Sequence, residues 1–418
     1  MTPSARHVLL GAPFDPYRLT NNAAAYSLSG AASDSTYLTG ASGLYYVADR
    51  SGNSAVNGLV LPGVAGNTAT TASKGLTGNQ TITADVQLTT YTPGTLHELF
   101  TKQSGNDGLY FRLQVDGTLR LTVGDGTSLT NMFSPVTGLA AFTRATLSVV
   151  WTDGVGATFF VNGAQLGTPQ AAAKTLTNAA TTATIGTNLS GIVYRVQVGS
   201  SYDFNATTAA KLATSVTDGV SGTWTINQTA IALPARIHGA RDLYQHLTAS
   251  MPTFSVSGGY NIATFDGTAD YVKSAPYSLS QPESVYFVGS QVSWTSGDYL
   301  YDGSGNAVMV LQQQTGTPQL NIYAGTYVGT TSPAIGSRFV DTAVFNGASS
   351  SHRLNKDAAV TGSCGVQNGS GFTLGSPGSG TSNWGNFTWS EALLRSAADA
   401  EALQLRIAAF EMRKWGIS

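Results

Sequence analysis

The chain has 418 residues, only 11% of them charged, and a formal net charge of −2 at pH 7. This balance leaves no basic surface for sequence-independent binding to nucleic-acid phosphates. The single cysteine, Cys364, excludes an intrachain disulfide and a cysteine-ligated zinc site, and we expect it to be a small buried or turn residue. The 48 glycines and many Thr and Ser residues indicate short strands joined by turns, as in an all-β protein.

The first forty residues differ in composition from the rest of the chain. They contain Pro3, Pro13 and Pro16 and then an Ala-, Ser- and Asn-rich stretch, which is typical of extended chain. For residues 1–40 we expect a partly ordered leader or edge strand, or an arm that anchors the protein to a larger particle. The apolar run at residues 8–10 is too short for a secretory signal, and no segment is long enough to span a membrane. We therefore expect synthesis in a cytoplasm without export.

Alternating apolar and polar residues predict the strands of a first domain over residues 41–218. The clearest alternation is in residues 144–151, where Ala145, Leu147, Val149 and Trp151 share one side, as in a half-buried strand. The next strand ends at Asn162-Gly163, a pair favoured in tight hairpin turns. We expect further strands at residues 43–47, 80–88, 96–102, 109–115, 119–123, 157–161 and 192–198.

The end of the first domain has a different pattern. Asn205 is a suitable helix cap, and Ala209, Leu212 and Val216 lie beyond it at spacings that share one helical face. We therefore expect a short helix there, then a linker over residues 219–229.

The second half repeats the layout of the first. Leu354-Asn355 matches Val161-Asn162 at an offset of 193 residues (354 minus 161), and Gly375 matches Gly186 at 189 (375 minus 186). A strand, a glycine turn, a second strand ending in Val-Asn-Gly and a later Ile-Gly step resemble concanavalin A-like jelly rolls of the laminin-G-like type. The resemblance implies two tandem β-sandwiches, the second over residues 230–418.

The most specific motif of the second domain is IATFDGTADYV at residues 262–272, which resembles the strand entry of laminin-G-like modules in bacteriophage proteins. We expect further strands at residues 284–292, 299–301, 307–311 and 319–323, and a hairpin over residues 339–356.

The chain ends in a predicted helix over residues 396–415. Ser396 is its expected cap, and Gly416 is its expected stop. Leu403, Ile407 and Phe410 form a narrow apolar stripe, so we expect this short C-terminal helix to pack on the outside of the second sandwich. The helix resembles the C-terminus of phage laminin-G-like proteins.

No constellation of residues indicates catalysis. Glycosidases built on this type of sandwich use two carboxylates, in the motif E-x-D-x-x-E, which is absent here. Asp266 and Asp270 are better explained as turn and hydrogen-bonding residues. The five histidines are scattered, and neither G-x-S-x-G nor a phosphate-binding loop occurs. We therefore expect a protein that is not an enzyme.

We expect no cofactor and no metal. Laminin-G-like domains can bind calcium at their rim, and the resemblance suggests Asn106-Asp107, or Asp302 with Asn306, as possible ligands. As ordinary turn residues they need no ion.

Aromatic residues are the remaining candidates, since carbohydrate sites combine flat rings with amide or carboxylate hydrogen bonds. The alternative is that most of these rings belong to the core or to cross-strand pairs. We would test Trp384 first, because it lies in a polar Gly/Ser/Asn run. The candidate glycan-binding residues are Trp294, Tyr299, Tyr301, Tyr323, Tyr327 and Trp384.

These observations lead to three hypotheses. The first is a structural bacteriophage protein, displayed on the head or tail of the virion, that contributes to host-surface glycan binding. Its expected partners are other virion proteins, host glycan and further copies of itself, without nucleic acid or a membrane span. The alternatives are a bacterial cell-surface or secreted carbohydrate-binding protein and a polysaccharide-degrading enzyme.

Overall fold

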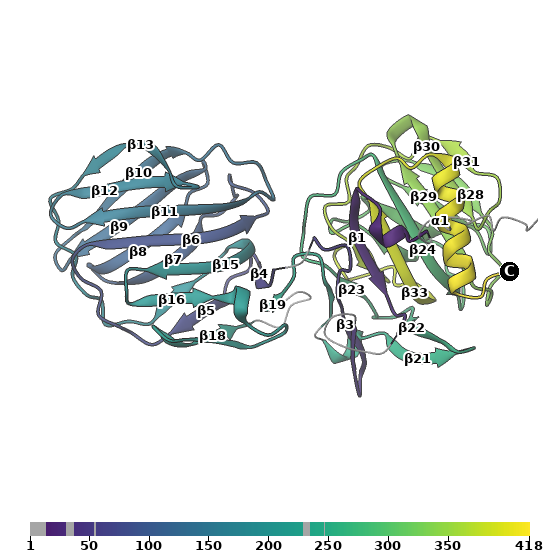
Figure 1. Ribbon diagram of the computed structural model, residues 1–418, viewed down its shortest axis with the longest axis horizontal. Coiled ribbons are helices and arrows are strands. Elements are labelled where there is room, and N and C mark those ends of the chain that lie inside the picture. Colours follow the sequence, from purple (N-terminus) through teal and green to yellow (C-terminus); the bar gives the residue numbers. More distant parts are fainter. Residues whose placement is uncertain (1–13, 31–36, 54–55, 229–234, 246) are drawn as a thin grey trace, which may run out of the picture.

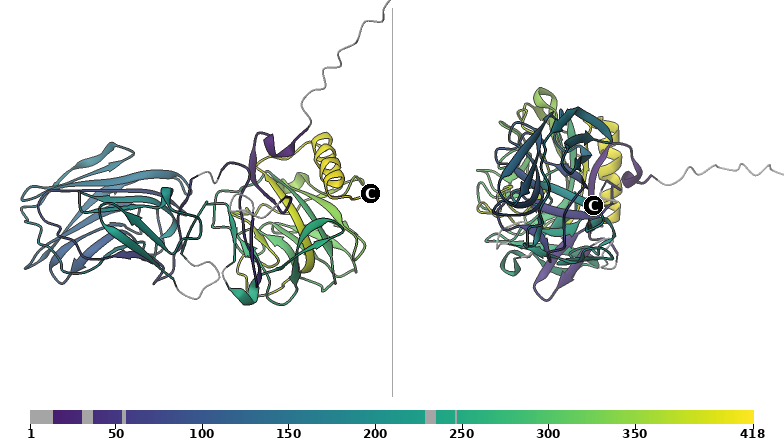
Figure 2. Two further views of the ribbon diagram at one scale, coloured as in Figure 1. Left: turned by 60° about the horizontal axis from the view of Figure 1, so that its bottom comes forward. Right: turned by 90° about the vertical axis from the view of Figure 1, so that its left-hand side faces the viewer.

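The computed structural model describes residues 14–30, 37–53, 56–228, 235–245 and 247–418. These residues form two β-sandwiches that lie side by side along the long axis, with an α-helix on the second (Figures 1 and 2). The expected all-β jelly-roll class with a short C-terminal helix is confirmed. Residues 1–13 of the expected arm lie outside the described residues. Within the described ranges, no helix is long and apolar enough to cross a membrane.

The first sandwich packs two antiparallel sheets against a core that contains Phe111, Trp151 and Trp224, all fully buried. One sheet has the order β13 (Ala164–Ala171), β12 (Gly156–Val161), β11 (Arg144–Thr152), β6 (Gln80–Leu88), β15 (Ser190–Val198), β4 (Gly58–Pro62) and β19 (Arg236–His238), and β16 (Tyr202–Asn205) also pairs with β15. The other has the order β10 (Leu129–Val136), β9 (Thr118–Asp125), β8 (Asp107–Leu113), β7 (His97–Ser104), β14 (Ala183–Ile185), β5 (Thr68–Thr71), β18 (Gly222–Asn227) and β17 (Ser215–Asp218).

The second sandwich has the same design, with Phe287, Tyr301 and Trp389 fully buried in its core. One sheet has the order β21 (Thr253–Ser257), β22 (Tyr260–Asp266), β33 (Asn386–Arg395), β24 (Glu283–Gln291), β29 (Phe339–Phe345), β30 (Ser350–Leu354) and β31 (Val360–Gly362), and β1 (Asn22–Ser27) also pairs with β33. The other has the order β2 (Tyr37–Gly40), β3 (Gly43–Val47), β20 (Leu243–Tyr244), β23 (Val272–Lys273), β32 (Thr373–Leu374), β25 (Tyr299–Asp302), β26 (Val310–Gln313), β27 (Leu320–Tyr323) and β28 (Tyr327–Thr331).

The strand order shows the duplication. The order β13-β12-β11-β6-β15-β4 in the first sandwich corresponds to β31-β30-β29-β24-β33-β22 in the second. Asn162 and Asn355 come directly after equivalent strands, and both have a φ of 51°. Each side chain accepts a hydrogen bond of 2.9 Å from a backbone N–H of the neighbouring strand. Gly186 and Gly375, with φ of 94° and 89°, likewise occupy matching places after β14 and β32.

The N-terminal strands belong to the second sandwich, which differs from the boundary at residue 41 that we expected. β1 pairs with β33, and β3 pairs with β20, so the chain begins its described part in the second sandwich (Figure 1). It then crosses to the first sandwich and returns after β19. The first sandwich is therefore inserted into the second. The physical reason is burial, since Ala24, Ala25 and Tyr26 of β1 are fully buried against the second sandwich.

Residues 206–227 also differ from the expected helix and linker. Only a single 3₁₀ turn forms, over Ala206–Thr208, and Asn205 caps it by accepting the backbone N–H of Thr207. The hairpin β17–β18 instead spans the end of the expected helix and most of the expected linker, and its strand β18 pairs with β5. Burial of the Trp224 side chain in the core holds this hairpin on the first sandwich.

The C-terminal helix α1 (Glu401–Lys414) begins five residues later than Ser396 because β33 continues to Arg395. Its N-cap is Ala400, so the expected capping role of Ser396 was wrong. As expected, the helix packs on the outside of the second sandwich, through Ile407 and Met412 among others (Figure 1).

Cys364 is buried, as expected, and its Sγ lies 2.9 Å from the Ser350 Oγ.

Candidate functional site

Strands β25 to β28 carry a patch of tyrosines and amides on the face that points away from the core. Tyr299, Gln312 and Asn321 lie opposite one another on successive strands, and Tyr323 lies opposite Tyr327. Residues paired across a ladder share one face of a sheet. We call these five residues the tyrosine–amide face.

The exposure of these residues varies across the face. Tyr327 is 54% exposed, whereas Gln312 is 3% and Asn321 8% exposed. The rings of Tyr323 and Tyr327 are 4.8 Å apart at an angle of 48°. The two amides are therefore buried, whereas the Tyr327 ring is exposed and the Tyr299 and Tyr323 rings are half-buried.

The three phenol groups of this face have no hydrogen-bond partner in the part of the chain that the structure describes. Among the described residues, none accepts or donates a hydrogen bond to the hydroxyl of Tyr299, Tyr323 or Tyr327. Burial, with smaller contributions from Asp302 and the two other tyrosines, raises the pKa of Tyr299 to about 12. This phenol therefore stays neutral near pH 7 and is available as a hydrogen-bond donor.

Trp384 lies beside this face. Its backbone forms a β-bridge with Tyr299, and the Tyr299 N–H donates to the Asn383 carbonyl at 2.9 Å. The Trp384 ring is half-buried, and its Nε1 has no hydrogen-bond partner among the described residues. The structure thus brings Trp384 together with Tyr299, Tyr323 and Tyr327 from the predicted set.

Trp294 belongs to the loop that precedes β25. The Gln313 side chain holds this loop: its Oε1 accepts the Thr295 N–H and its Nε2 donates to the Ser293 carbonyl, each at 2.8 Å. Burial raises the pKa of Asp298 in the same loop to about 6. The Trp294 side chain is half-buried, and its Nε1 lacks a partner among the described residues.

Tyr301 does not belong to the candidate site. Its side chain is fully buried and packs against Phe287 and Phe372 in the core. The register of β25 shifts between Tyr299 and Tyr301, so residues two apart do not share a face here. Regular alternation would place both rings on one surface, and an irregularity of this kind separates them.

The calcium candidates are engaged in structural hydrogen bonds. The Asp302 carboxylate is fully buried and accepts five backbone N–H groups, including Ala307 at 2.8 Å and Gly303 at 2.7 Å. The Asn306 Oδ1 accepts the Ser379 N–H. Asp107 accepts the Thr177 hydroxyl at 2.7 Å, and Asn106 donates to the Thr127 carbonyl. Within the described ranges, no cluster of three or more His, Cys, Asp or Glu residues has the geometry of a metal site.

Asp266 and Asp270 form the expected turn. Asp266 accepts the N–H groups of Thr268, Ala269 and Asp270, and Asp270 accepts that of Asp266 at 3.0 Å. Burial, assisted by the Asp266 charge, raises the pKa of Asp270 to about 7.

Sequence reasoning missed a comparable face on the first sandwich. The Arg112 guanidinium lies 3.6 Å from the Tyr110 ring centre, and Arg120 lies 5.1 Å from it. The polar groups here are used within the face, since Arg112 pairs with Glu98 and Arg120 donates to Asn131. Alternation in β8 and β9 gave the outward positions, but only the strand register shows that they are adjacent.

Comparisons with known proteins assign neither a family nor a function to this chain. No family model matches the chain, and no curated protein matches it. Solved structures that are similar include domains LG4-5 of the mouse laminin alpha1 chain (12% identity, 86% of this chain, 91% of that chain, TM-score 0.33). A second is the LG1-3 region of the laminin alpha2 chain (10% identity, 80% of this chain, 63% of that chain, TM-score 0.28). A third is domain 4 of a GH43 extracellular arabinanase from Geobacillus stearothermophilus in complex with arabinotriose (11% identity, 38% of this chain, 82% of that chain, TM-score 0.31). These scores are too low to support any argument about function.

Proposed function

We propose that this protein binds glycans through the tyrosine–amide face. The observation that carries this proposal is that three tyrosine hydroxyls on one face have no partner among the described residues, while the rings of Tyr323 and Tyr327 lie in contact. Flat rings pack against the apolar faces of sugars, and phenol and amide groups exchange hydrogen bonds with sugar hydroxyls. Trp384 extends this surface with a further half-buried ring.

The proposed activity is binding without hydrolysis. Glycosidases use two carboxyl groups about 5 to 10 Å apart, one of which donates a proton. Near this face, both oxygens of Asp302 accept backbone N–H groups, which leaves that carboxylate unsuited to act as an acid or a nucleophile.

We further propose that the protein is displayed on a bacteriophage particle, on the head or tail, as a homo-oligomer that contacts other virion proteins. This proposal is supported by the resemblance of residues 262–272 and of the terminal helix to phage laminin-G-like proteins. Mass spectrometry of purified virions tests it. We expect peptides of this chain in the particle, and their absence would refute the virion role.

A polysaccharide array tests glycan binding. We expect Tyr327→Ala and Trp384→Ala each to weaken binding by about tenfold, the equivalent of one lost ring contact. Phe160→Ala is the matched control, because Phe160 is a half-buried ring on β12 of the other sandwich. Tyr327 is exposed, so its loss should not unfold the domain. Unchanged binding in both variants would remove this face from the site, and release of reducing ends from the bound polysaccharide would show catalysis.

A further inference from the structure

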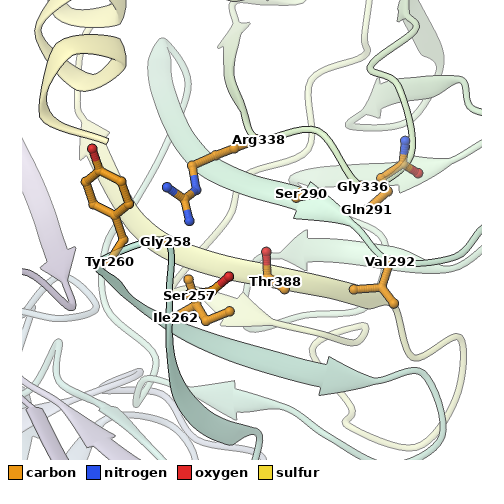
Figure 3. Close-up of a pocket in the computed structure, with 10 residues that line it drawn as sticks. All are labelled: Ser257, Gly258, Tyr260, Ile262, Ser290, Gln291, Val292, Gly336, Arg338 and Thr388. Atoms are coloured by element: carbon orange, nitrogen blue, oxygen red, sulfur yellow. The ribbon is translucent and has the colours of Figure 1, made fainter. Parts of the chain in front are cut away.

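A cavity lies on the opposite sheet of the second sandwich, beside helix α1. It has a volume of about 450 Å³, which is within the range for small-molecule sites. Figure 3 shows Tyr260, Ser290, Arg338 and Thr388 around it. We call it the Arg338 pocket. Ser290 and Thr388 lie opposite each other on β24 and β33, on the part of the sheet that α1 leaves uncovered.

Arg338 is a fixed cation that has no counter-ion among the residues that the structure describes. Its Nη1 donates to the Trp415 carbonyl at 2.9 Å, and its Cζ lies 4.7 Å from the centre of the Tyr260 ring. Within the described ranges, no carboxylate oxygen lies within 4 Å of its guanidinium, and no acidic residue lines the pocket. The half-buried guanidinium therefore retains Nε and Nη2 as unused donors, which form the edge that binds a carboxylate by two hydrogen bonds.

The rest of the lining suits a hydroxylated ligand. The hydroxyls of Ser257, Ser290 and Thr388 make no hydrogen bond to any described residue. The Ser290 residue is only 8% exposed, so its unpartnered hydroxyl lies at the base of the cavity rather than on its rim. Ile262 and Val292 supply apolar surface at the same cavity, as the carbon skeleton of a sugar requires.

We propose that the Arg338 pocket binds the carboxylate-bearing residue of an acidic glycan. Arg338 pairs with the carboxylate through its free edge. The hydroxyls of Ser290 and Thr388 bond to the sugar, and the Tyr260 ring closes one side (Figure 3). This site is separate from the tyrosine–amide face, which lies on the other sheet.

NMR titration of the full chain tests the proposal with matched probes. Methyl glucuronide is compared with methyl glucoside, and the methyl glycoside of N-acetylneuraminate with its methyl ester, so that each pair differs at the carboxylate. Inorganic phosphate tests whether any anion suffices. We expect at least one acidic sugar to bind about tenfold or more tightly than its neutral counterpart, with phosphate weaker.

Variants assign the binding to Arg338. Arg338→Gln should weaken binding of the acidic sugar by about tenfold. Arg413→Gln removes the same charge from an exposed position of α1 and should leave this affinity unchanged. Thr388→Val should weaken binding of acidic and neutral sugars to the same extent. Equal binding of each acidic and neutral pair, phosphate binding as tight as the sugar, or full affinity in Arg338→Gln would each overturn the proposal. Tyr327→Ala should not alter this titration, so failure here is distinct from failure of the tyrosine–amide face.

Discussion

Tyr26 offers the sharpest test of the inserted arrangement, because the sequence alone placed it in an N-terminal arm. In the structure it is fully buried on β1 and stacks on Phe372, with ring centres 5.7 Å apart and planes at 6°. Its hydroxyl donates to the Arg241 carbonyl at 2.6 Å. Tyr26→Ala therefore creates a cavity in the second sandwich and leaves that carbonyl without this donor.

These contacts set the expected cost of the substitution. Truncation of a buried aromatic ring costs about 3 to 5 kcal/mol, and the lost hydrogen bond adds about 1 kcal/mol. For a domain of this size each kcal/mol lowers the melting temperature by about 2 to 4 °C, so we expect a fall of roughly 8 to 24 °C. Among the described residues, the apolar contact between the sandwiches is small, with Val60 and Tyr194 against Ala240 and Tyr244, so we expect two transitions in scanning calorimetry.

The control separates the two sandwiches. Tyr91→Ala removes a ring that is 2% exposed in the first core and donates to the Thr143 carbonyl at 2.7 Å. Tyr26→Ala should shift only the transition of the second sandwich, and Tyr91→Ala only that of the first. If Tyr26→Ala left both transitions in place, residues 22–27 would be the loose arm that the composition suggested, and the insertion would be wrong.

Three further predictions concern stability and ions. Burial raises the pKa of Glu283 to about 8, and its two carboxyl oxygens have no partner among the described residues. The folded state therefore binds more protons than the unfolded state between about pH 4.5 and 8. The free energy of unfolding should fall as the pH rises through this range. Glu283→Gln should remove this loss of stability, which is on the order of 4 kcal/mol. Urea unfolding at pH 5 and pH 8 measures the difference, and a variant with the same pH dependence as the natural chain would contradict this role of Glu283. Lys414→Met leaves the buried Glu391 without its ion-pair partner and should cost about 3 to 5 kcal/mol in the same assay, whereas the exposed Arg413→Met should change stability by less than about 0.5 kcal/mol. Because the Asp302 oxygens are occupied by backbone N–H groups, neither calcium nor EDTA should shift the melting temperatures, and a calcium-dependent shift would contradict this assignment.

Local signals predicted most of the strands. In β11 the alternation of Leu147, Val149 and Trp151 corresponds to complete burial of all three side chains, because one face of the sheet covers the core. Asn162 and Asn355 marked equivalent turns because each tolerates a positive φ and bonds the next strand. Such features depend on residues close together in the sequence, which is why they could be found there.

The exceptions required information from distant parts of the chain. Three consecutive alanines in β1 have no period of two, and only the pairing with β33, more than 350 residues away, makes them a strand. The turn of the hairpin β17–β18 contains Gly219, so residues 219–229 resembled a linker, but burial of Trp224 fixes the hairpin on the first sandwich. In the candidate site, the sequence grouped Tyr299 with Tyr301, and the register shift of β25 separates them.

The junction between the sandwiches explains how an insertion can remain invisible in the sequence. Asp242 is fully buried where the chain returns to the second sandwich, and its Oδ1 accepts the N–H of Asp49, where the chain leaves. Its Oδ2 accepts the Tyr46 hydroxyl at 2.6 Å, and Lys211 of the inserted sandwich lies 3.5 Å away. One carboxylate thus joins the outgoing segment, the returning segment and the inserted sandwich. Because these groups are separated by up to 196 positions, no local pattern marks the junction, although a buried carboxylate with several donors is what such a crossing needs.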